Sequence, residues 1–224
     1  MITFEKVVKK FGSTSALDEI SFDIKEGEFV FLTGSSGAGK TTLVRLLLRE
    51  LTPDSGKILI EDRDISTLKS CDIPHYRRKL GVVFQDFKLL LDRTVYENVA
   101  LALEVTGEWE NKSSSINDAL EEVGLSQKAN LFPRQLAGGE QQRAVIARAL
   151  VTNPKLVLAD EPTGNLDPAT ARQIVELLDK ISKSGTTVLM ATHNEILVNS
   201  LKRRVIKLKD GKVASDKVGA KYDE

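Results

Sequence analysis

The chain has 224 residues, and its 32 lysines and arginines balance 32 acidic residues, so the formal net charge is zero. This length suits one large α/β domain, with or without a subdomain. Proteins that bind nucleic acid or adhere to anionic lipid usually carry a basic excess, so the balance argues against both functions. The single cysteine, Cys71, rules out an intrachain disulfide and fits a reducing, cytoplasmic setting.

The N-terminal third predicts strands joined by short turns. Strands are predicted at 2–8, 17–24 and 28–33, with a Lys-Glu-Gly turn before the third. The first residues lack the pattern of a signal peptide. No apolar run reaches the roughly 18 residues that a membrane-spanning helix needs. We therefore expect any attachment to a membrane to depend on another chain.

Residues 34–42 read Gly-Ser-Ser-Gly-Ala-Gly-Lys-Thr-Thr, the G-x-x-x-x-G-K-[ST] pattern of a phosphate-binding loop. The strand at 28–33 precedes this loop, and a helix predicted over 41–50 follows it, which a chance glycine-rich turn would not require. Glycines let backbone N–H groups turn towards phosphates, and the helix N-terminus adds positive potential. We expect Lys40 to reach the β- and γ-phosphates of a nucleotide and the Thr41 hydroxyl to ligate Mg²⁺.

The middle of the chain changes from strand to helical character. Strands are predicted at 56–60 and 80–84, but from about 94 to 133 helical periodicity takes over, as in Ile116, Ala119, Leu120 and Val123. This stretch predicts a helical insertion in an α/β core. Its segment 107–115 is predicted to be a loop, with Trp109 as a surface packing residue, and His75 is interpreted as a loop residue without a motif.

A second glycine-rich helix start follows at 136–143, which read Leu-Ala-Gly-Gly-Glu-Gln-Gln-Arg and lead into an amphipathic helix to Leu150. Two glycines at a helix N-terminus make a second anion-binding site in the same chain. A phosphate-loop protein does not in general need a second anion-binding helix N-terminus. The loops at 34–42 and 136–140 of one chain are not both expected to face the same nucleotide. The pattern therefore predicts a head-to-tail dimer, in which each ATP lies between the first loop of one chain and the second loop of the other.

An apolar strand at 155–159 ends in two acids, Asp160 and Glu161. A carboxylate at the carboxyl end of such a strand is placed to hold Mg²⁺, and we assign this role to Asp160. Glu161 can then polarise a water opposite the γ-phosphate as a general base. Two acids in a solvated turn are the alternative, which the upstream phosphate loop disfavours.

The C-terminal region returns to alternating elements. Pro168 opens a helix that Gly185 ends, and a buried strand is predicted at 186–191. A hairpin is predicted from 205 to 214, and the charged residues 215–224 are expected to fray.

These motifs, in this order, resemble the ABC (ATP-binding cassette) ATPase family over nearly the whole chain. In that family 136–140 form the signature motif, which binds the γ-phosphate held by the opposite subunit. The resemblance also makes Gln85 the Q-loop glutamine, 164–167 the D-loop and His193 the switch histidine, a hydrogen bonder to the γ-phosphate. It implies that Phe11 stacks on adenine, although from its residue type alone Phe11 would be a core residue.

The motifs and the resemblance together give a complete set of candidate site residues. The catalytic candidates are Lys40, Gln85, Glu161 and His193, and the metal candidates are Thr41, Gln85 and Asp160. The nucleotide-binding candidates are Phe11, Gly34, Ser35, Ser36, Gly37, Ala38, Gly39, Lys40, Thr41, Thr42, Ala137, Gly138, Gly139 and Glu140. ATP and Mg²⁺ are the implied ligands.

The signature departs from the family pattern at two positions. The family usually has serine where this chain has Ala137, and often glutamine where it has Glu140. Without the serine hydroxyl, contact with the γ-phosphate relies on the amides of Gly138 and Gly139. A lost hydrogen bond to a charged group costs about 1.5–3 kcal/mol, so weak dimerisation or slow turnover is expected.

Within the family, segments 83–90, 94–100 and 187–194 are similar to ATPases that act in cell division with an integral membrane protein, as is the tail containing Tyr222. The block 159–167 is shared with ATPases of lipoprotein-release and macrolide-export systems, which remain an alternative. Chromosome-maintenance ATPases insert long coiled coils that this chain lacks. A structural adaptor with a vestigial ATPase is a third possibility, against which the intact catalytic candidates argue.

The resulting prediction is a single P-loop NTPase domain of the ABC type over 1–224. An α/β core with an antiparallel β layer is expected at 1–93 and 154–224, and a helical subdomain at about 94–153. The resemblance implies a homodimer in the ATP-bound state, held at the cytoplasmic face of the cell membrane by an integral membrane partner. No nucleic acid and no direct membrane insertion are expected.

Overall fold

The computed structural model describes residues 1–107, 113–219 and 222, which fall into two compact units. The first unit comprises Met1–Arg77 and Thr187–Glu224, and the second comprises Arg78–Thr186. Each unit is described by itself.

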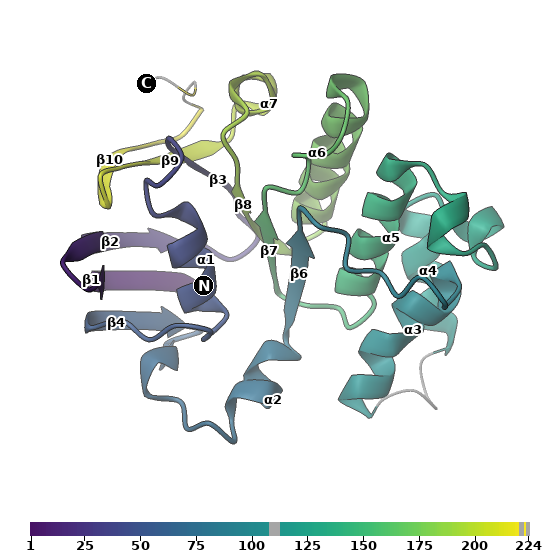
Figure 1. The fold of residues 1–224 in the computed structure, drawn as a ribbon, viewed down its shortest axis with the longest axis horizontal. Coiled ribbons are helices and arrows are strands. Elements are labelled where there is room, and N and C mark those ends of the chain that lie inside the picture. Colours follow the sequence, from purple (N-terminus) through teal and green to yellow (C-terminus); the bar gives the residue numbers. More distant parts are fainter. Residues whose placement is uncertain (108–112, 220–221, 223–224) are drawn as a thin grey trace. The chain divides into compact units, whose positions relative to one another are not determined.

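An antiparallel sheet forms one layer of the first unit (Figure 1). Its strands, in spatial order, are β2 (Thr14–Ile24), β1 (Ile2–Phe11), β4 (Ser55–Ile60) and β5 (Arg63–Asp64). The rings of Phe4 and Phe22 stack across β1 and β2 with their centroids 4.7 Å apart. Such an aromatic pair adds about 0.5–1.5 kcal/mol beyond its buried area. The antiparallel layer predicted from the N-terminal third is confirmed.

A mixed set of strands forms the core of the first unit. They are β3 (Phe29–Thr33), β8 (Thr187–Ala191), β9 (Arg204–Lys209) and β10 (Lys212–Lys217). β3 pairs in parallel with β8 and with β9, and β9 and β10 form an antiparallel hairpin. Every residue of β3 and β8 is buried, as expected for parallel strands covered on both faces. The helical elements of this unit are α1 (Lys40–Leu47), η1 (Ile65–Thr67), α2 (Ile73–Arg77) and α7 (Glu195–Leu201).

The second unit combines two parallel strands with a group of helices. β6 (Leu80–Phe84) pairs with β7 (Leu156–Asp160). The helical elements are α3 (Val95–Thr106), α4 (Ser113–Glu122), η3 (Ser126–Lys128), η4 (Pro133–Gln135), α5 (Gly138–Leu150) and α6 (Pro168–Lys183). Helices α3, α4 and α5 pack against one another in the teal and green part of Figure 1. The helical region expected after residue 94 is thus confirmed.

Two predictions of loops were wrong. His75 lies in helix α2 because Tyr76 and Arg77 donate hydrogen bonds to carbonyls at the end of α1, those of Leu47 and Leu48. These tertiary bonds stabilise a five-residue helix that its sequence alone would not predict. Residues 113–115, expected in the loop 107–115, belong to α4, which begins at Ser113, and Trp109 lies outside the described residues.

The C-terminal segment is also more ordered than the sequence indicates. Strand β10 extends to Lys217, so residues 215–217 are not frayed. The guanidinium of Arg204 on β9 binds the Asp216 carboxylate at 2.7 Å and the Glu28 carboxylate at 3.1 Å, which raises the pKa of Arg204. This ion pair across the hairpin holds strand β10 in register where charge alone predicts solvation.

Candidate functional site

The phosphate-binding loop lies in the first unit between β3 and α1, and its shape requires glycine. Gly34, Gly37 and Gly39 have φ angles of 140°, 80° and 108°, which residues with a Cβ rarely adopt. A Cβ on Gly34 would lie 2.4 Å from the Leu208 carbonyl oxygen, and one on Gly39 would lie 2.7 Å from that of Ala16. The loop leads to Gly39 as the N-cap of α1, whose first N–H groups have no helical carbonyl to bind.

Lys40 is the first residue of α1 and lies over this loop. The residue is only 8% exposed, and its ammonium donates to the Gly34 carbonyl at 2.7 Å and to the Ser35 carbonyl at 3.1 Å. A buried ammonium needs such partners. The positive charge is therefore fixed beside the glycine-rich turn, while Thr41, the predicted metal ligand, is exposed.

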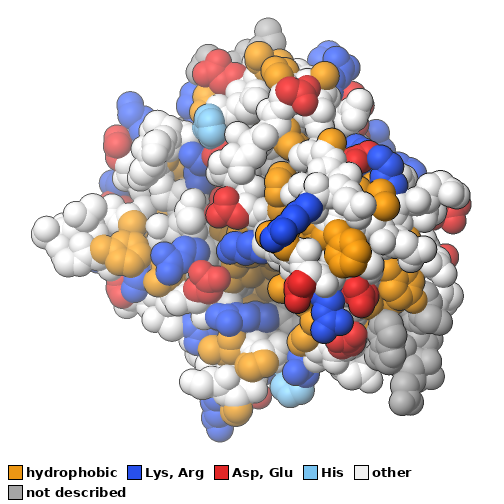
Figure 2. All heavy atoms as spheres, turned by 45° about the vertical axis from the view of Figure 1, so that its right-hand side comes forward, with side chains coloured by type: hydrophobic (Ala, Val, Ile, Leu, Met, Phe, Trp, Pro, Cys, Tyr) orange, Lys and Arg blue, Asp and Glu red, His pale blue; other side chains and the backbone are white. Residues whose placement is uncertain are grey.

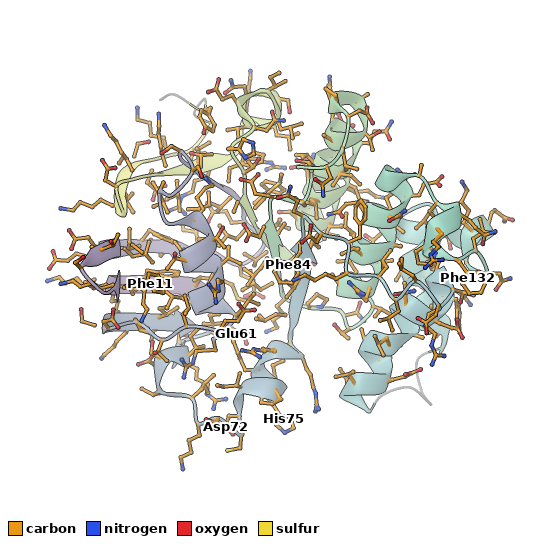
Figure 3. The ribbon with its side chains drawn as sticks, in the orientation of Figure 1. Phe11, Glu61, Asp72, His75, Phe84 and Phe132 are labelled. Carbon is orange, nitrogen blue, oxygen red and sulfur yellow. The ribbon has the colours of Figure 1, made fainter. Side chains whose placement is uncertain are left out.

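Two other candidates of the first unit, Phe11 and His193, are exposed. Phe11 ends β1 and is 47% exposed, with the Lys9 ammonium 5.7 Å from its ring centroid (Figure 3). Its ring is thus a surface feature and not a core residue, as a stacking role requires. His193 follows β8 and lies between Thr192, which is buried, and Asn194, which caps α7.

Asp160 and Glu161 lie at the carboxyl end of β7 in the second unit. Both are half-buried, and Glu161 has a φ of 49°, in the left-handed region. A residue with a Cβ pays of order 1–3 kcal/mol in such a conformation. The Glu161 carbonyl accepts a hydrogen bond from the Gly164 N–H at 3.1 Å, which closes a tight turn directly after the strand.

Gln85, directly after β6, is bound to the turn that follows β7. Its side-chain nitrogen donates to Asn165 Oδ1 at 3.2 Å, and Asn165 Nδ2 donates to the Gln85 carbonyl at 3.3 Å. A Cβ on Gly164 would lie 2.8 Å from the amide of Gln85, so a larger residue there would displace the end of the Gln85 side chain. The contacts use the nitrogen of the Gln85 amide and not its oxygen, the atom that can ligate a metal.

The signature segment forms the N-terminus of α5. Ala137 is the N-cap, and its N–H donates to the Glu140 carboxylate at 3.1 Å. This is only the reverse half of a capping box, because the Ala137 methyl cannot accept a bond from the Glu140 N–H. Lys128 Nζ lies 2.5 Å from the same carboxylate, and this hydrogen bond is the main reason that the pKa of Glu140 is lowered.

Helix α5 is also bound to the backbone that follows β6. Gln142 Nε2 donates to the Phe84 carbonyl at 3.3 Å, and the Arg148 guanidinium donates to the carbonyls of Lys88 at 2.8 Å and Phe87 at 3.2 Å. These bonds join the signature helix to both sides of Gln85 along the chain.

Replacing Gly139 by alanine is expected to destabilise the second unit. The new Cβ would lie 2.3 Å from Thr170 Cγ2 on α6, a short β-branched side chain that cannot rotate away freely. Overpacking of this kind costs about 1–3 kcal/mol, and each kcal/mol lowers the melting temperature of a chain this size by about 2–4 °C.

The matched control is Gly138→Ala, because a Cβ there would lie 3.4 Å from Leu166 Cδ2, close to ordinary contact. Thermal melting followed by circular dichroism should show a fall for Gly139→Ala only. Equal melting temperatures for the two variants would contradict this account of the packing.

The candidate residues are divided between the units, and their donor chemistry fits Mg²⁺ and a polyphosphate. Phe11, the phosphate loop and His193 belong to the first unit, whereas Gln85, the signature and the two acids belong to the second. Hydroxyl, amide and carboxylate oxygens are the ligands that Mg²⁺ prefers, usually with one or two carboxylates and substrate phosphates.

Sequence reasoning missed two side chains that position this site, Lys128 and Arg148, which act on residues 12 and 60 positions away along the chain. Asn165 lies in the predicted D-loop, but its bond to Gln85, 80 positions away, was not foreseen. No local motif marks Lys128 or Arg148.

Charged side chains of both signs are interspersed on the face drawn in Figure 2, with several Lys and Arg side chains near its centre. Among the described residues, no helix is long and apolar enough to cross a membrane.

Comparisons with known proteins find clear relatives. The model of the ABC transporter family matches residues 17–164. The cell division ATP-binding protein FtsE of Bacillus subtilis (strain 168) is 50% identical over 99% of this chain and 98% of that protein. FtsE of Mycobacterium tuberculosis (strain ATCC 25618 / H37Rv) is 49% identical over the same shares. A dimeric post-hydrolysis structure of the ATP-binding cassette MJ0796 with ADP and Pi matches with a TM-score of 0.84 and 36% identity, over 98% of this chain and 99% of that chain.

Proposed function

Because the chain belongs to the ABC transporter family and is an ATPase subunit of its cell-division type, we propose that it hydrolyses ATP with Mg²⁺ as the partner of the membrane protein FtsX. The observation that carries the ATPase proposal is the phosphate loop, folded as strand, glycine turn and helix with Lys40 fixed over it. Identity of about half over nearly the full length of FtsE proteins supports the partner.

The residues have separate roles in this proposal. The phosphate loop 34–42 binds the phosphates through backbone N–H groups, Lys40 and the hydroxyl groups, and Phe11 stacks on adenine. Thr41, Gln85 and Asp160 would hold Mg²⁺, which neutralises charge on the phosphates when bound. Glu161 takes a proton from the attacking water, and His193 donates a hydrogen bond to the γ-phosphate.

Two anion-binding helix starts in one chain call for a dimer in which each ATP meets the phosphate loop of one protomer and residues 136–140 of the other. The dimeric form of the MJ0796 cassette supports this arrangement. Held by FtsX, the dimer would act at the cytoplasmic face of the cell membrane. In this proposal each protomer is one ABC ATPase domain, with its α/β core at 1–93 and 154–224 and its helical subdomain at about 94–153.

The experiment has two parts. Purified protein should release phosphate from ATP with Mg²⁺ and not with EDTA, whereas a vestigial adaptor would release none under either condition. Co-expression with FtsX should recover both chains from detergent-solubilised membranes. Recovery with a lipoprotein-release or macrolide-export permease in competition with FtsX would contradict the cell-division partner.

Replacing Ala137 by serine is expected to raise ATPase activity and ATP-dependent dimerisation. A hydroxyl at this position can donate to the γ-phosphate across the dimer, and a charge-assisted bond of about 1.5–3 kcal/mol corresponds to about a tenfold to hundredfold gain. Since Ala137 is the N-cap of α5, serine can also accept from the Glu140 N–H and stabilise the helix by about 0.5–2 kcal/mol.

Melting temperature reports the capping effect, and phosphate release with size-exclusion chromatography reports the phosphate contact. Ala137→Val is the steric control. If Ala137→Ser matches the parent in both rate and dimerisation, then the hydroxyl is dispensable in this chain.

A further inference from the structure

The signature of this chain carries a negative charge where it is proposed to meet a phosphate. Glu140 is the third residue of α5, within the first turn of the helix. An acid there stabilises the helix itself by interaction with its dipole. The same charge opposes an incoming γ-phosphate, because like charges a few ångströms apart repel in a partly desolvated site.

The structure shows how this charge is held and compensated. One oxygen of the Glu140 carboxylate accepts from the Ala137 N–H at 3.1 Å, and the other binds Lys128 Nζ at 2.5 Å. Arg143 on the next turn lies at 4.0 Å from the carboxylate, at the limit of an ion pair. Lys128 is thus the main counter-charge, in agreement with its leading effect on the lowered pKa of Glu140.

Lys128 is fixed by its own backbone. It ends the short helix η3, its N–H donates to the Leu125 carbonyl at 2.8 Å, and its carbonyl accepts from the Leu131 N–H at 3.0 Å. Leu125 is only 1% exposed, so η3 is anchored in the packed interior of the second unit. The Lys128 side chain is 42% exposed and that of Glu140 is 19% exposed, so the ion pair is partly exposed to water.

We propose that Lys128 is a positioning residue of the signature. It turns the Glu140 carboxylate back onto the Ala137 N–H and offsets its charge, so that the N–H groups of Gly138 and Gly139 can donate hydrogen bonds to a γ-phosphate. The proposal rests on the function proposed above. It assigns to Lys128 and Glu140 together the electrical neutrality that an uncharged glutamine at position 140 would provide alone.

The test is a double-mutant cycle in the full-length protein, with the variants Lys128→Met and Glu140→Gln and the variant that carries both changes. ATP-dependent dimerisation is measured by size-exclusion chromatography in the Glu161→Gln background, and phosphate release is measured with Glu161 present. Lys128→Met should lower the affinity of each signature segment for the γ-phosphate about threefold, which is the size of effect expected for a partly exposed ion pair. Both sites of a homodimer change together, so the dimer dissociation constant should rise by about tenfold.

The same Lys128→Met change should have little effect once Glu140 is glutamine, and Lys128→Arg, which keeps the charge, should resemble the parent. Lys183→Met is the matched control, because Lys183 is also paired with an acid, Asp179 at 2.7 Å, at the far end of α6. If Lys128→Met weakens dimerisation equally with Glu140 and with Glu140→Gln, the proposal is overturned, because a lysine that acts only through packing would have the same effect in both.

Two further measurements separate this proposal from the proposed function. Binding of a fluorescent ATP analogue to monomeric protein at low concentration reports the phosphate loop and should be the same with and without Lys128→Met. Loss of this binding would instead indicate unfolding and would overturn a positioning role. If the Glu161→Gln parent binds the analogue but never dimerises with Mg-ATP, then the dimer proposal fails, and the role of Lys128 fails with it.

Discussion

Replacing Glu161 by glutamine is expected to reduce ATP hydrolysis by about a hundredfold to ten-thousandfold while ATP binding persists. Glutamine keeps the shape of the side chain but cannot take a proton from water. Because hydrolysis no longer separates the protomers, Mg-ATP should trap a dimer. Phosphate release and size-exclusion chromatography with saturating Mg-ATP measure the two effects.

Glu122→Gln, an exposed acid at the end of α4, is the control for loss of one negative charge. It should retain parental turnover and show no trapped dimer. A Glu161→Gln variant that stays monomeric in saturating Mg-ATP would argue against the nucleotide sandwich. One that hydrolyses ATP at the parental rate would remove Glu161 from the role of general base.

Replacing Lys40 by alanine is expected to lower hydrolysis by about a hundredfold to a thousandfold, the usual effect of removing one fixed positive charge from a developing transition state. The structure adds a second consequence. The ammonium also binds the carbonyls of Gly34 and Ser35. The Ser35 carbonyl still accepts from the Ala38 N–H at 3.1 Å, but the buried Gly34 carbonyl loses this bond in the variant, at a cost of about 1–3 kcal/mol. A fall in melting temperature without nucleotide should therefore accompany the loss of activity.

Phosphate release, binding of a fluorescent ATP analogue and thermal melting are measured together on Lys40→Ala. Lys57→Ala on β4 removes the same charge from an exposed position and should change none of them. Parental activity in Lys40→Ala would mean that the loop does not act on the γ-phosphate through this lysine.

The parts of the fold that the sequence predicted are those whose signals are local. The glycines at 34, 37 and 39 indicate a turn with positive φ angles, which residues with a Cβ rarely adopt. Buried strands such as β3 and β8 are recognised as short, largely apolar runs. The acids after β7 follow such a run directly. In each case neighbouring residues carry the whole pattern.

The parts that the sequence did not predict depend on contacts between distant residues. Helix α2 needs Tyr76 and Arg77 to bind the end of α1, and the carboxylate of Glu140 needs Lys128 from a separate short helix. The bonds between Asn165 and Gln85 likewise join segments 80 positions apart. A single sequence gives no measure of which distant side chains will meet, so these partners emerge only from the folded chain.

The bonds from Gln142 and Arg148 to the carbonyls of Phe84, Phe87 and Lys88 have a mechanical consequence. They hold the backbone on both sides of Gln85 against the signature helix α5 within the second unit. We therefore expect a displacement of the backbone at Gln85 to be coupled to a reorientation of the Gly138–Gly139 amides, because one cannot shift far without breaking these bonds.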